Sequence, residues 1–236
     1  MPAFQAAADA GAAYFELDVH LSRDGEIVVH HDPHFGRTCG RPDSICESTW
    51  AQITELDAGY GFSIDAGRSF PARGRGIRVP RLAEVLAAFR QQRILIEIKQ
   101  EKPSLVDPLV KLIDRSGVRK NVAIASELQQ PIDQVRALAP DLPTNLPYFE
   151  IVEFMQALAA RNESYRPRGN ALQVPPEYEG WKLAIPEIIE YAHLVGLVFD
   201  VWTVNEEAEM RSLLDAGVDG IITDYPARAL KVIGSR

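Results

Sequence analysis

Cysteine, basic charge and long apolar runs are all scarce in this chain, and each shortage excludes a class of protein. Only Cys39 and Cys46 occur among 236 residues, too few for a disulfide framework or a zinc cluster, so we expect two free thiols. The formal net charge of -8 disfavours nucleic acid as a partner, because proteins that bind it gather Lys and Arg on one face.

The apolar runs fall far short of a membrane span, so no integral membrane segment is expected. No basic segment followed by an apolar one opens the chain, as a secretion signal would. We therefore expect a cytoplasmic protein, and a signal peptide upstream of Met1 stays the alternative.

The composition, with 46% hydrophobic residues and no biased tract, is typical of one globular domain spanning residues 1–236. Short apolar runs alternate with helical patterns, which indicates a parallel sheet built from βα units. The expected strands are 14–19, 94–98, 121–125, 144–149, 171–174, 197–202 and 220–223. The expected helices are 2–10, 81–91, 104–116, 131–139, 151–160, 186–195, 206–216 and 226–233.

Residues 35–80 do not follow this alternation. They are rich in Gly, Arg, Ser and Thr, and we expect them to form an inserted segment on the rim of the sheet. The expected strands are also one short of a closed (β/α)8 barrel, since the pattern begins with a helix, and a missing strand leaves two open edges. A seven-stranded or open α/β sheet is the structural alternative. An open edge could be closed by another subunit, so an oligomer is possible.

Carboxylates interrupt two of the apolar strands near their C-terminal ends, where parallel barrels place their sites. Glu16 and Asp18 lie two residues apart and share a face, as do Glu97 and Lys99 on the next βα strand. Buried acids repel one another unless a cation joins them, and an all-oxygen set favours Mg²⁺ or Ca²⁺ over zinc. The pattern therefore favours a metal site, with a chance pairing of acids as the alternative.

Other polar residues follow strand-like runs. His31, directly before Asp32, could move a proton near neutral pH while Asp32 fixes its tautomer, whereas His30 should point to the opposite face. A structural histidine is the alternative at position 31. Trp202 could line a substrate pocket or pack in the core. Asp224 is expected to cap the last helix.

Six motifs resemble, in order and spacing, the glycerophosphodiester phosphodiesterase family: "ELDVHLSRDGEIVVHHDP", "RT" at 37–38, "VPRLAEVL", "IEIK", "WTVN" and "GVDGIITDYP". The resemblance runs from the first residue to about Pro226. It implies a TIM (β/α)8 barrel of the phosphatidylinositol-phosphodiesterase-like type, with an inserted segment after the second strand. It also implies metal-dependent hydrolysis of small glycerophosphodiesters to glycerol 3-phosphate and an alcohol.

Carried over by position, the resemblance makes Glu16, Asp18 and Glu97 the ligands of one divalent cation, Mg²⁺ or Ca²⁺. His31 becomes the catalytic histidine, and Lys99 becomes a cation beside the substrate phosphate. Apart from the resemblance, the place of Trp202 at a strand end would allow it to contact an apolar or glycerol part of the substrate.

The family pattern opens with a His-Arg-Gly strand and a Glu-Asn-Thr loop, and this chain starts just after both. We therefore expect either a start site assigned too late or a truncated chain. One alternative is a noncatalytic relative that acts as a binding module. Another is a different metal-dependent barrel reaction, such as sugar-phosphate isomerisation.

Overall fold

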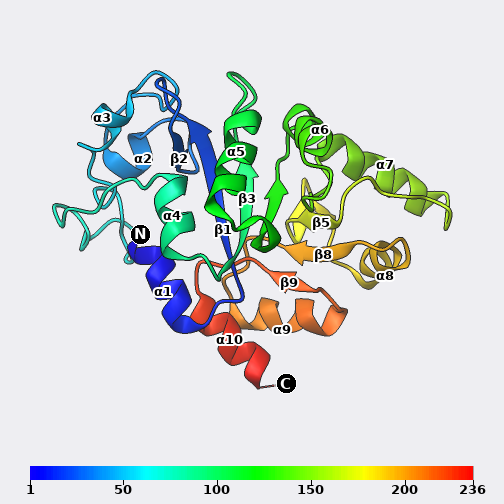
Figure 1. Ribbon diagram of the computed structural model, residues 1–236. Helices are drawn as coiled ribbons and strands as arrows, with labels where there is room; N and C mark the ends of the chain where they lie inside the picture. Colours follow the sequence, from blue (N-terminus) through cyan, green and yellow to red (C-terminus); the bar gives the residue numbers. More distant parts are fainter. Residues whose placement is uncertain (236) are drawn as a thin grey trace.

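A computed structural model of the chain describes residues 1–235, and parallel strands alternate with helices as the sequence predicts (Figure 1). The parallel strands are β1 (Tyr14–Leu21), β3 (Arg93–Ile98), β4 (Val122–Ala125), β5 (Ala171–Val174), β8 (Val198–Val201) and β9 (Gly220–Ile221). The helices that accompany them are α1 (Pro2–Ala10), α4 (Leu82–Ala88), α5 (Val106–Ser116), α6 (Gln129–Leu138), α7 (Tyr148–Ala159), α8 (Pro186–Leu194), α9 (Glu207–Ala216) and α10 (Pro226–Gly234). A short 3₁₀ helix, η1 (Arg119–Asn121), leads into β4.

The strands form one parallel series in two hydrogen-bonded groups, β1-β3-β4 and β5-β8-β9. Single bridges from Thr144 to Ile124 and from Asn145 to Ala171 connect the two groups. No pairing joins β1 to β9 within residues 1–235, so these two strands end the parallel series, and β2 (Ile27–Val29) pairs antiparallel with the outer side of β1. At the opposite ends of the chain, α1 and α10 lie side by side (Figure 1).

The expected strand 144–149 is wrong in its second half. Only Thr144 and Asn145 pair as a strand, and Pro147 caps the N-terminus of α7, which already includes Tyr148 and Phe149. Proline has no backbone N–H for a sheet and its fixed φ suits the start of a helix, so the strand ends before it.

Several short elements were not among the expected strands and helices, although the apolar run before His30 and His31 was expected to be extended. β2 (Ile27–Val29) pairs antiparallel with the end of β1, and β6 (Glu177–Tyr178) pairs with β7 (Trp181–Lys182) as a hairpin. Two four-residue helices, α2 (Gly36–Cys39) and α3 (Trp50–Ile53), lie in the inserted segment. Such elements are too short for sequence periodicity to reveal.

The inserted segment, residues 35–80, has a small apolar core of its own. Its buried side chains pack with Val28 of β2 and are Phe35, Cys39, Ile45, Ile53, Leu56 and Val79. One close approach fixes its path: a Cβ on Gly61 would lie 2.0 Å from the carbonyl oxygen of Arg37, so only glycine fits there. The segment is therefore a packed structure on the rim, at the left of Figure 1.

Alternation along the strands separates the core from the interior of the barrel. Phe15 and Leu17 of β1, and Ile94 and Ile96 of β3, are buried against the surrounding helices. The residues between them face the other way, toward the space that the strands enclose, because successive side chains of a strand point to opposite faces. No helix within residues 1–235 combines the length and the apolar character that crossing a membrane requires.

Candidate metal and active site

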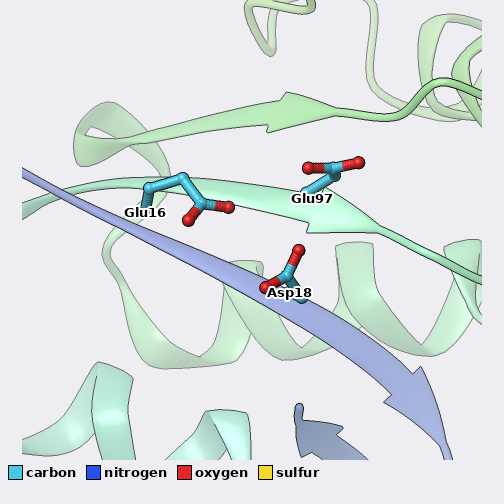
Figure 2. Close-up of side chains that lie close together, drawn as sticks. All are labelled: Glu16, Asp18 and Glu97. Atoms are coloured by element: carbon cyan, nitrogen blue, oxygen red, sulfur yellow. The ribbon is translucent and has the colours of Figure 1, made fainter. Parts of the chain in front are cut away.

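The register of β1 on β3 brings three carboxylates together. Asp18 pairs with Glu97, and Glu16 lies two residues before Asp18 on the same face. Figure 2 shows the three side chains gathered beside these two strands. One ligand oxygen from each lies within 4.8 Å of the other two, which is close enough for a single cation to contact all three. The convergence expected from the sequence is present in the structure.

Burial makes this cluster electrostatically unfavourable without a cation. Burial, followed by the charges of Asp18 and Glu97, raises the pKa of Glu16 to about 8. Burial also raises the pKa of Glu97, although Lys99 acts in the opposite direction. A hard divalent cation prefers oxygen ligands and favours the ionised carboxylates, so these residues fit Mg²⁺ or Ca²⁺.

Lys99 supplies the positive charge at the cluster in this structure. Its Nζ lies 2.6 Å from Glu97 Oε1 and 3.4 Å from Asp18 Oδ1. Burial disfavours the charge on Lys99, but the hydrogen bond to Glu97 and the surrounding carboxylates together raise its pKa, so it stays protonated. Glu127, two residues after β4, also influences the pKa values of Glu97 and Lys99. Negative charge thus exceeds positive charge at the site.

His31 is held by a short chain of hydrogen bonds. Its Nδ1 donates to Asp32 Oδ1 over 2.8 Å, and Asp32 in turn accepts from Arg37 Nε at 2.8 Å and Nη2 at 2.9 Å. The Arg37 hydrogen bond is the largest cause that holds the pKa of Asp32 well below its usual range. The His31 ring is 62% exposed, and this arrangement leaves its Nε2 free to move a proton.

His30 points away from His31, as the sequence predicts for neighbouring residues of an extended run. It is buried, its Nδ1 donates to the backbone oxygen of Asp32 at 2.7 Å, and its Nε2 accepts from Thr38 Oγ1 at 2.6 Å. Burial lowers the pKa of His30, so the ring is neutral at physiological pH. His30 is therefore a structural histidine that holds the inserted segment against β2.

Trp202 directly follows β8 and is half-buried. Asp224 does not cap α10, and that expectation is wrong. The N-cap is Tyr225, and the Asp224 carboxylate instead accepts from Asn205 Nδ2 at 2.8 Å. The charge of Asp224, which follows β9, also contributes to the raised pKa of Glu16.

Sequence reasoning missed the role of Arg37. "RT" at 37–38 was part of the family resemblance, but no periodicity relates Arg37 to Asp32, because both lie outside regular strands. Glu127 was also missed. It follows the expected strand 121–125, and a carboxylate just after a strand could have been recognised as a residue near the site.

Comparison with known proteins identifies the family. Residues 1–228 match the glycerophosphoryl diester phosphodiesterase family. The glycerophosphodiester phosphodiesterase of Caldanaerobacter subterraneus is 31% identical over 98% of this chain and 90% of its own length. That of Bacillus subtilis is 30% identical over 91% of this chain and 74% of its own length. The chain therefore belongs to the glycerophosphoryl diester phosphodiesterase family, as the motifs predict.

Solved structures show the same fold. A putative glycerophosphoryl diester phosphodiesterase from Silicibacter pomeroyi has 28% identity and a TM-score of 0.79, and the match covers 98% of this chain and 86% of that one. A phosphodiesterase from Oleispira antarctica, solved with the product sn-glycerol-3-phosphate, has 20% identity and a TM-score of 0.77 over 98% of this chain and 89% of that one. The fold is the TIM barrel of this family, as expected.

Proposed function

We propose that this protein hydrolyses glycerophosphodiesters to glycerol 3-phosphate and an alcohol, with one divalent cation, Mg²⁺ or Ca²⁺, as cofactor. The observation that carries the proposal is the convergence of three carboxylates from β1 and β3 beside Lys99, in a chain of this family. The Oleispira antarctica relative was solved with sn-glycerol-3-phosphate, which supports the proposed product.

Glu16, Asp18 and Glu97 would hold the cation. An ion held there would supply Lewis-acid chemistry toward the phosphate and would lower the pKa of a hydroxyl or water. The acidic charge of the site also argues for the ion, because a phosphodiester anion would otherwise be repelled by the carboxylates, which Lys99 offsets only in part. We therefore expect substrate binding to require the cation.

The remaining steps fall to side chains of the chain itself. Lys99 offsets the negative charge that develops on the phosphoryl oxygens in the transition state. His31 donates a proton from Nε2 to the alcohol oxygen as the phosphorus–oxygen bond to the alcohol breaks and its electron pair leaves with that oxygen. Over the whole reaction water supplies the new oxygen on phosphorus and restores the proton to His31.

Two residues complete the proposed site. Asp32, fixed by Arg37, keeps the proton on His31 Nδ1 and so presents Nε2 to the substrate. Trp202, half-buried at the end of β8, would contact the glycerol group. We also propose a cytoplasmic location, which the cysteines support because both are free thiols in residues 1–235.

The test is release of glycerol 3-phosphate from glycerophosphocholine by the protein as its own cell makes it. We expect chelation to abolish release and Mg²⁺ or Ca²⁺ to restore it. Asp18→Asn should lower turnover by roughly 10²-fold or more, the effect of losing one transition-state contact. Asp107→Asn, an exposed carboxylate on α5, is the matched control and should act like the wild type. Release that continues unchanged in chelator would overturn the proposal.

A further inference from the structure

A cavity of about 230 Å³ lies next to the proposed site, between the ends of β1 and β3 and the inserted segment. Its lining residues are His20, Pro33, Ile45, Cys46 and residues 99–102. Lys99 belongs both to this cavity and to the carboxylate cluster, since its Nζ contacts Glu97 and Asp18. A phosphate beside Lys99 would therefore lie at the border of the cavity.

The neighbours of His31 form another wall of the same cavity. His20 Nε2 lies 3.0 Å from the backbone oxygen of His31, and Pro33 follows His31 by two residues. His31 is the proposed proton donor to the alcohol oxygen, so that oxygen has to lie near these residues. In the proposed reaction Lys99 and His31 act at the breaking bond, and Lys99, His20 and Pro33 line the cavity.

We propose that this cavity, the leaving-alcohol pocket, receives the alcohol of the diester and limits its size. The inference rests on the proposed function. It gives the two halves of the substrate separate places, because Trp202 follows β8, whereas the residues that line the cavity lie on β1, just after β3, and in or beside the inserted segment. The glycerol would lie toward β8 and the alcohol toward the inserted segment.

The walls of the pocket are fixed before any substrate binds. Gln100 Oε1 accepts from the backbone N–H of Leu21 at 3.1 Å, and Gln100 Nε2 donates to the backbone oxygen of Pro103 at 2.7 Å. Ile45 is buried in the core of the inserted segment. A wall held in this way does not widen easily for a larger ligand.

Size and lining indicate the chemical class of the alcohol. Pockets for drug-sized ligands begin at roughly 300 Å³, and this cavity is smaller, at about 230 Å³. Pro33 and Ile45 offer apolar contact, and Glu101 and Lys102 offer charge of both signs. The pocket therefore fits a small polar alcohol, such as ethanolamine, choline or glycerol.

Cys46 provides a way to fill the pocket in the folded protein. It is exposed and lines the cavity, whereas Cys39 is buried, and burial raises the pKa of the Cys39 thiol. Thiol reagents react with the thiolate, so alkyl methanethiosulfonates should modify Cys46 first. The added group is removed by dithiothreitol, which makes each protein sample its own control.

The experiment measures kcat/KM before and after modification with benzyl methanethiosulfonate, using diesters of glycerol 3-phosphate with methanol, ethanolamine and inositol. Misfit in a pocket costs roughly tenfold or more, so we expect that loss for the inositol diester, mainly in KM, and little change for the methyl diester. Dithiothreitol should restore activity. The kcat/KM values of the Cys46→Ser protein should not change when the reagent is added, because the remaining thiol, Cys39, is buried.

Equal losses for the methyl and inositol diesters, or no loss for either, would contradict the leaving-alcohol pocket while leaving diester hydrolysis intact. Failure of the unmodified protein to release glycerol 3-phosphate from any of the three diesters would instead overturn the proposed function itself. A Cys46→Trp variant gives the same comparison without a reagent, and it should discriminate against inositol in the same direction.

Discussion

Replacing Lys99 with methionine should separate the structural role of this residue from its role in catalysis. Methionine keeps an unbranched side chain of similar length and removes the charge. In the structure Lys99 Nζ lies 2.6 Å from Glu97 and 3.4 Å from Asp18, and these side chains are only 15–21% exposed. The variant would leave three neighbouring carboxylates without the lysine that contacts two of them.

The expected loss of stability follows from these distances. With an effective dielectric constant of about 20, Coulomb's law gives roughly 6 kcal/mol for Lys99 with Glu97 and roughly 5 kcal/mol with Asp18. Desolvation offsets much of this attraction, and breaking a buried pair by removing one partner costs about 3–5 kcal/mol. Since the site is partly exposed, we expect the free energy of unfolding in chelator to fall by about 3 kcal/mol. For a chain of this size that lowers Tm by roughly 6–12 °C.

A divalent cation should repair the stability but not the chemistry. Mg²⁺ or Ca²⁺ would replace the missing positive charge, so adding the ion should raise the Tm of Lys99→Met by more than it raises that of the wild type. Turnover in the presence of the ion should still fall by roughly 10²–10³-fold, because Lys99 no longer offsets charge in the transition state. Thermal unfolding and glycerol 3-phosphate release, each with chelator and with the ion, measure both effects.

The matched control is Lys111→Met on α5, where an exposed lysine contacts Asp107 at 2.7 Å. An exposed ion pair of this kind contributes about 0–1 kcal/mol, so this variant should stay close to the wild type. The proposed role of Lys99 would be refuted if Lys99→Met had the wild-type Tm in chelator and the ion raised the Tm of both proteins equally.

Two further predictions concern pH. The depressed pKa of Asp32 contributes stability that is present above its ordinary pKa and is lost as pH falls toward the depressed value. Arg37→Leu should therefore lower stability at neutral pH and flatten the acid side of the profile, measured by urea unfolding; an unchanged profile would count against the Asp32–Arg37 pair. Burial raises the pKa of Asp200, so the ionised carboxylate destabilises the folded protein. This cost is full above the raised pKa, and it disappears as pH falls to the ordinary pKa of an aspartate, because Asp200 is then protonated in both the folded and the unfolded state. Asp200→Asn keeps an acceptor for Gln173 Nε2 and should raise Tm at neutral pH, with the gain disappearing in acid; a lower Tm at neutral pH would show that the charge is needed.

The carboxylate cluster could be predicted because two simple rules determine it. Side chains two apart on a strand share a face, and neighbouring parallel strands end at the same edge of a sheet. Glu16 and Asp18 on β1 therefore had to approach Glu97 and Lys99 on β3 once these strands paired. Neither rule needs the rest of the fold.

Contacts made by irregular segments could not be predicted in the same way. Arg37 reaches Asp32 because the inserted segment turns back on β2, and Gly61 fixes that path through its contact with the Arg37 carbonyl. Asp224 binds Asn205 across two loops instead of capping a helix. The leaving-alcohol pocket likewise depends on where Ile45 and Cys46 pack, which no local pattern specifies.

Pro147 shows a different kind of error. The apolar content of residues 144–149 favoured a strand, but the proline ends pairing after Asn145 and begins α7. Because proline cannot donate to a sheet and favours the start of a helix, Pro147 indicates a shorter strand and a helix that begins at 148 instead of 151. The consequence for the site is small, because none of the proposed ligands lies in this segment.

Calorimetric titration of the metal-free protein with Mg²⁺ and with Ca²⁺ tests the central claim most directly. We predict that one ion binds per chain and that Asp18→Asn weakens the affinity for the ion by roughly tenfold or more. Losing a residue that only orients a metal ligand already costs about tenfold, and losing a ligand should cost at least as much. Asp107→Asn should bind as the wild type does. Absence of binding to the wild type, or equal affinity in Asp18→Asn, would contradict a cation site formed by Glu16, Asp18 and Glu97.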